Sequence, residues 1–115
     1  MQSGGASQRE RRTELPIIVD GDSVMFGPEV ADALGHPPHI QIKVNETQKS
    51  ILLQPCSIDD REAIVVPPKL PFAVKGQSLM KTIRRLTGWV DKKPRVIYGY
   101  KVVGFNAIVF NLMNN

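Results

Sequence analysis

The apolar residues of this chain occur in short runs, and proline or glycine ends most of them. Nine prolines and nine glycines are spread over 115 residues. Such runs between breaks are typical of β-strands, because proline cannot donate to a sheet and glycine permits a tight turn. We therefore predict strands or shorter extended segments over residues 15–19, 24–26, 40–44, 51–53, 63–66, 71–74, 95–103 and 107–112.

Two segments have helical spacing instead. Apolar residues recur on one face of each, at Val30, Ala33 and Leu34 in the first and at Leu79, Ile83 and Leu86 in the second. Pro28 suits the first position of a helix, where no hydrogen bond is lost. Gly35 and Gly88 stand where a helix ends with positive φ. Together with the strands, these helices predict an α+β fold.

Several classes of protein do not fit the sequence. No run of about 18 apolar residues exists, so we expect no transmembrane helix. Residues 1–13 lack the apolar core of a secretory signal, which favours a cytoplasmic protein, and their polar composition predicts a disordered tail. The single cysteine, Cys56, cannot form an internal disulfide or a multi-thiolate zinc site.

The sequence has no clear catalytic signature. We therefore expect no catalytic residues, no cofactor and no metal, and the chain is predicted not to be an enzyme. A small enzyme that uses Cys56 with His36 or His39 is a weaker alternative, because it needs the fold to bring a base to the thiol. Loop acids such as Asp20 and Asp22 are more typical of turns than of catalysis.

Charge divides the chain into two halves. Residues 1–62 hold six Lys/Arg against ten Asp/Glu, whereas residues 63–115 hold nine Lys/Arg against Asp91 alone. A surplus of this size in the second half attracts polyanions. A basic surface kept for solubility is the alternative, but solubility does not require the charges to segregate.

The strongest functional signal is a group of cations within this basic half. We predict that DNA phosphates contact Lys81, Arg84, Arg85, Lys92, Lys93 and Arg95, with Lys101 close by in the sequence. Helical spacing places Lys81, Arg84 and Arg85 on one face. Trp89, Tyr98 and Tyr100 either stack on bases or pack in the core.

The segment from Ser23 to Pro55 resembles the AbrB/SpoVT-type swapped-hairpin family of bacterial DNA-binding regulators. The matching positions are Val24, Phe26, Glu29, Val30, Ala33, Leu34, Gly35, Ile40, Ile42, Val44, Ile51, Leu53 and Pro55. The resemblance implies a homodimer of interleaved hairpins whose core holds Val24, Phe26, Val30, Leu34, Ile40 and Ile42. Ser23 and Ala31 stand where the family has arginines, and Gly27 where it has proline, so no DNA contact is carried over to them.

These observations predict three parts in the chain. A tail (1–13) precedes a swapped-hairpin-like dimerisation module (14–56) and a basic module (57–115) of one helix and a β-hairpin. The favoured function is a bacterial DNA-binding transcriptional regulator that acts as a dimer on double-stranded DNA through its basic half, without a membrane. The alternative is a non-enzymatic assembly module that binds an acidic protein partner.

Overall fold

The computed structural model describes residues 14–91 and 93–112, and antiparallel strands are its main element. The tail predicted over residues 1–13 and the predicted contact residue Lys92 lie outside the described residues. In chain order the elements are β1 (Leu15–Asp20), β2 (Ser23–Phe26), α2 (Pro28–Ala33), β3 (His39–Asn45), β4 (Ser50–Pro55), β5 (Ile64–Val65), β6 (Phe72–Lys75), α3 (Gln77–Thr87), β7 (Arg95–Lys101) and β8 (Ile108–Asn111).

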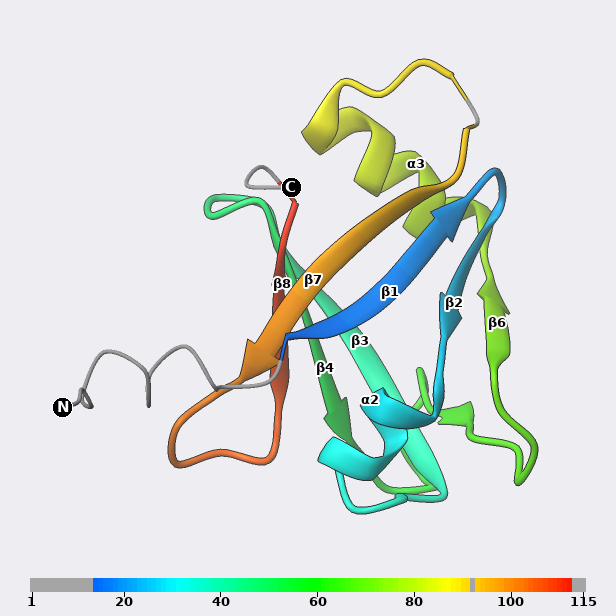
Figure 1. The fold of residues 1–115 in the computed structure, drawn as a ribbon, viewed down its shortest axis with the longest axis vertical. Coiled ribbons are helices and arrows are strands. Elements are labelled where there is room, and N and C mark those ends of the chain that lie inside the picture. The colour runs from blue at the N-terminus through cyan, green and yellow to red at the C-terminus, as the bar shows by residue number, and fades with distance from the viewer. Residues whose placement is uncertain (1–13, 92, 113–115) are drawn as a thin grey trace, which may run out of the picture.

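The strands form one sheet, which curls almost into a barrel and stays open between β5 and β6 (Figure 1). Its strand order is β5-β3-β4-β8-β7-β1-β2-β6. Three of the pairs are hairpins between consecutive strands, namely β1–β2, β3–β4 and β7–β8. Three others join strands far apart in the sequence, namely β1–β7, β2–β6 and β4–β8. The α+β class is confirmed, in a strongly β-rich form.

Glycine and proline set the bounds of both helices, as their positions predict. Pro28 opens α2, and the chain reverses after Leu34 at Gly35, whose φ is +82°. Gly88, with φ +79°, ends α3 in the left-handed conformation. Such dihedral angles cost a glycine little because it has no Cβ. None of the described helices is long and apolar enough to cross a membrane.

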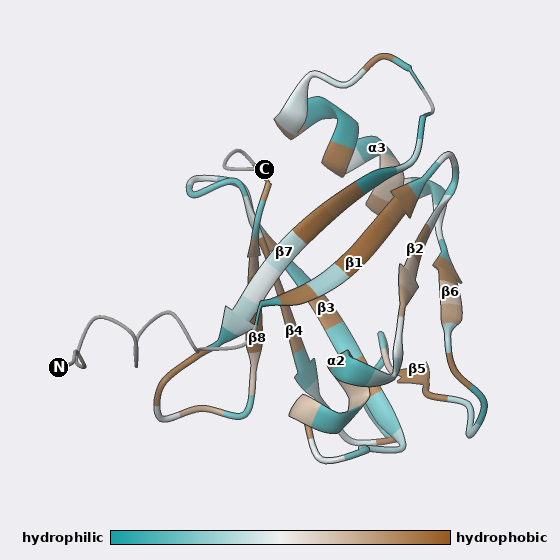
Figure 2. Cartoon of the chain, viewed as in Figure 1, coloured by the Kyte–Doolittle hydropathy of each residue, from teal (hydrophilic) through white to brown (hydrophobic). Residues whose placement is uncertain are grey.

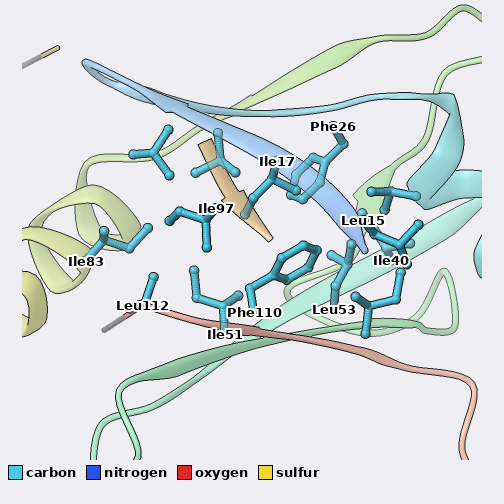
Figure 3. Close-up of a cluster of buried hydrophobic side chains, with 14 of the residues drawn as sticks. Leu15, Ile17, Phe26, Ile40, Ile51, Leu53, Ile83, Ile97, Phe110 and Leu112 are labelled. Carbon is cyan, nitrogen blue, oxygen red and sulfur yellow. The ribbon is translucent and has the colours of Figure 1, made fainter. Parts of the chain in front are cut away.

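The core lies inside the curl of the sheet and is closed at one end by α3. Alternate residues of the strands point inward, as the burial of Leu15, Ile17 and Val19 along β1 shows. Figure 3 shows Ile17, Ile51, Ile97 and Phe110 pointing toward one another, although they come from four different strands. α3 adds Met80, Ile83 and Leu86 to the buried set. In Figure 2, hydrophobic and hydrophilic residues accordingly alternate along this helix.

One glycine is required by close packing rather than by its dihedral angles. Gly99 lies on the inner face of β7, opposite Phe110 of β8. A Cβ at Gly99 would lie 2.5 Å from both the Phe110 ring and the carbonyl oxygen of Val109. The Phe110 ring, which is 0% exposed, therefore fills the space that a side chain at residue 99 would need.

The two predicted modules share this sheet. β1 lies between β2 and β7, and β8 lies between β4 and β7, so strands from the two sides of residue 56 are interleaved in one sheet. The side chain of Asn106 also reaches across, donating a 3.0 Å hydrogen bond to the carbonyl of Leu34. The predicted boundary between residues 56 and 57 thus does not separate two sheets.

The residues expected in a dimer core are covered within a single chain. Five of the six predicted core residues are at most 3% exposed, namely Val24, Phe26, Val30, Leu34 and Ile40. Ile42 is half-buried and packs against the same cluster. Their apolar faces are covered by the one sheet to which both halves of the chain contribute strands.

Candidate nucleic-acid interface

α3 lies at one end of the molecule and has one apolar face and one polar, basic face (Figure 1). Its exposed side chains are Gln77, Ser78, Lys81 and Arg85. At 100° per residue, these four positions fall within about a quarter of the helix circumference. No acidic residue occurs in this helix. The outward face of α3 is therefore a row of hydrogen-bond donors with two positive charges.

The side chain of Arg84 contacts the turn between β1 and β2 and is not part of the outward face of α3. Its guanidinium donates a hydrogen bond from Nη2 to the carbonyl of Gly21, and the same nitrogen lies 3.8 Å from a carboxylate oxygen of Asp22. The Arg84 side chain is only 28% exposed. These contacts fasten α3 to the turn between β1 and β2.

Arg85 also pairs with an acid of the first half of the chain, but this pair is exposed to solvent. Its Nη1 lies 2.9 Å from Oε1 of Glu46, in the turn between β3 and β4, and both side chains are more than half exposed. This hydrogen bond, with the charge of Arg85, holds the pKa of Glu46 below its ordinary value. Because water screens an exposed pair, Arg85 can exchange Glu46 for another anion at little cost.

The loop after α3 fixes Arg95 through two neighbours. The guanidinium of Arg95 lies 4.7 Å from the centre of the Trp89 ring, which is within range of a cation–π interaction. Its Nη2 also donates to both carboxylate oxygens of Asp91, at 3.1 and 3.2 Å. Asp91 accepts a further bond from the backbone N–H of Lys93, and this bond is the largest cause of its lowered pKa. The Trp89 ring therefore helps to hold the Arg95 guanidinium in place.

The structure brings the five described cations of the predicted site to the same end of the molecule. They are Lys81, Arg84, Arg85, Lys93 and Arg95, which lie on α3, the loop after it and the start of β7. Within the residues that the structure describes, Lys81 and Lys93 make no ion pair, and both are exposed. Among the described phosphate contacts that were predicted, the two most open to a ligand are therefore lysines.

Sequence reasoning missed two groups of residues at this end. Gln77 and Ser78 share the outward face of α3, and their helical spacing from Lys81 could have indicated them. No local pattern identified Asp22 and Glu46 as partners of arginines, since 62 and 39 residues separate them along the chain. Tyr98 and Tyr100, at 46% and 42% exposed, lie on the outer face of β7.

Among the residues of the enzymatic alternative, Cys56 lies beside His39, whose carbonyl accepts a 3.1 Å hydrogen bond from the Cys56 N–H, whereas His36 contacts Asp32. Cys56 is half-buried, and desolvation raises the pKa of its thiol, with the charge of Asp60 adding to the effect. A thiol nucleophile needs the opposite shift. The Nε2 atom of His36 lies 2.5 Å from Asp32, one helical turn away, rather than at the sulfur.

No family model matches the chain, and no curated protein or solved structure is significantly similar to it.

Proposed function

We propose that the protein is a DNA-binding regulator whose α3 contacts duplex DNA. The observation that carries this proposal is the outward face of α3, where Gln77, Ser78, Lys81 and Arg85 are exposed and the helix itself contains no acid. The major groove of DNA is wide enough to admit an α-helix, and arginine, glutamine and serine are residue types that hydrogen-bond base edges there.

The neighbouring cations suit the DNA backbone. Lys93 is exposed in the loop that follows α3, and a lysine at the flank of a helix can contact phosphate and set its orientation on the duplex. Arg85 is available through exchange with Glu46, whereas Arg84 is committed to Gly21 and Asp22. Arg84 therefore positions α3 in this proposal and does not count as a DNA contact.

The homodimer stays a prediction that rests on the family resemblance alone. Its expected core residues already pack inside one chain, so a dimer formed without exchange of strands would use another surface. The swapped-hairpin arrangement likewise stays a prediction.

The test is the salt dependence of binding to duplex DNA. Each phosphate neutralised adds about 0.9 to the slope of log affinity against log salt. Replacing Lys81, Arg85 and Lys93 together with alanine should therefore lower the slope by about 2–3. The measurement is fluorescence anisotropy of a labelled duplex over a salt series.

The matched control is the alanine variant of Arg61, Lys69 and Lys101, which removes the same charge away from α3. Lys101 ends β7, whereas Arg95 begins it, and Arg61 and Lys69 flank β5. The proposal requires a clearly larger loss of slope in the α3 variant. Equal losses would mean that only net charge matters, and no binding by the unmodified protein would reject the proposal.

A further inference from the structure

A hollow of about 710 Å³ lies where the curled sheet fails to close. One wall is the open end of β3 with β5, and the other is β6 with the first turns of α3. Its apolar lining consists of Ile42, Val44, Ile64, Val74 and Leu79, all half-buried. The volume falls in the range of about 300–1,000 Å³ that is typical of ligand pockets.

Both long walls of this hollow are open strand edges. β5 pairs with β3 only at His39 and Ile40, so within the described residues no strand pairs with this edge of β3 from Gln41 to Asn45. In the described ranges, β6 pairs with β2 alone. Uncovered edges present backbone N–H and C=O groups that can pair with another strand.

The direction of these two edges suits a single additional strand. Every pairing in the sheet is antiparallel, and six pairings lead from β3 around to β6, so both strands run the same way. One strand of opposite direction would therefore pair antiparallel with both. β5 already runs in this opposite direction but is only two residues long.

Charge indicates what such a strand must carry. Lys43 on β3 and Lys75 on β6 are exposed, one on each rim, while their neighbours Ile42, Val44 and Val74 face the hollow. Side chains alternate between the two faces of a strand. An inserted strand would place one set of side chains among the apolar residues and the other set between the two lysines. Among the lining residues, Glu62 is the acid and Lys43 and Lys75 are the bases, so positive charges outnumber negative ones.

We propose that this open seam binds an extended segment of a partner protein in which apolar and acidic residues alternate. The bound segment completes the sheet by β-strand addition, with backbone hydrogen bonds to β3 and β6 supplying affinity and the alternate side chains supplying specificity. The chain's own residues 1–13 do not fit this pattern, because they contain three arginines and no large apolar residue beyond Met1. This site adjoins the outward face of α3 and shares Ser78 with it.

The probe is a synthetic eight-residue peptide that alternates valine and glutamate, titrated into the full chain. We expect binding to slow backbone amide exchange within 41–45 and 72–75, measured by NMR. The same peptide with N-methylated backbone nitrogens should bind at least about tenfold more weakly, because it cannot donate to the strand edges. A peptide that alternates valine and lysine tests the charge requirement and should not bind.

The matched variants are K43E/K75E at the rims and K49E/K69E away from the hollow, both with exposed side chains and the same change of charge. The rim variant should lose at least about tenfold in affinity for the acidic peptide, while the control variant should lose much less. Equal losses in both variants, equal binding of the N-methylated peptide, or exchange protection elsewhere would each overturn the proposal. So would the absence of binding by the unmodified chain at millimolar peptide.

Discussion

The two halves of this chain differ in net charge, but both contribute strands to the same sheet. Residues 14–62 carry nine acids against three bases, and residues 63–112 carry nine bases against one acid. Each half nevertheless places strands between those of the other, and Arg84 and Arg85 of the second half approach Asp22 and Glu46 of the first. Charge that is segregated along the sequence is thus partly complementary in space. On the outward side of α3 and the loop after it, the described lysines Lys81 and Lys93 make no ion pair and remain for an external polyanion.

The largest expected effect comes from separating the halves. A fragment of residues 14–56 should not fold alone, because β1, β2 and β4 would each lose a pairing partner and the inner face of the sheet would lose its cover. Circular dichroism and the dispersion of NMR amide signals measure this. A fragment that folds cooperatively as a dimer would contradict the shared sheet and support interleaved hairpins instead.

A smaller effect is expected from Leu34, which is 3% exposed just beyond α2. Replacing it with alanine should lower the free energy of unfolding by about 2–5 kcal/mol, since a buried leucine leaves a cavity. Urea denaturation measures the change. If a second copy of the chain buried Leu34, the urea midpoint of unfolding would rise with protein concentration. Burial of Leu34 within one chain predicts a midpoint that does not depend on concentration.

The two arginines that cross between the halves should respond differently. Arg84→Gln should cost about 1–3 kcal/mol of stability, because Arg84 is mostly buried and donates to the Gly21 carbonyl. Arg85→Gln should leave the unfolding midpoint nearly unchanged and should weaken binding to duplex DNA instead. The two variants remove the same charge from adjacent positions and serve as controls for each other. A larger loss of stability in Arg85→Gln would reverse the assignment of their roles.

The smallest expected effect concerns pH. The pKa of Glu46 is lowered in the folded state, so its ionised form stabilises the fold above its ordinary pKa, and this contribution disappears as pH falls through the lowered value. The stability difference between the unmodified chain and Glu46→Gln should therefore shrink on acidification below about pH 5. Urea titrations at several pH values measure this. A difference that grows toward acid would contradict the Arg85–Glu46 contact.

Local sequence patterns predicted the positions of the helices and strands well, but they did not predict which strands far apart in the sequence pair. Pro28, Gly35 and Gly88 act through their own dihedral angles, so both ends of α2 and the C-terminal end of α3 could be predicted without the fold. The pairing of β1 with β7 depends instead on which apolar faces fit together after about 80 residues of intervening chain, and no local signal encodes that. The same distinction holds at the candidate site. Helical spacing placed Lys81 and Arg85 on one face, but the anchoring of Arg84 by Gly21 depends on the tertiary structure.

The position of β1 has a consequence for how the protein is made. During synthesis β1 leaves the ribosome well before its long neighbour β7, which begins only at Arg95. Until then, one edge of β1 and the apolar face that includes Ile17 have no final partner. Contacts between residues so far apart in the sequence close slowly, because the entropy of the intervening loop must be lost before they form. The sheet can therefore be completed only after β7 and β8 have been synthesised, and the interval before that is when its open edges are most exposed to aggregation.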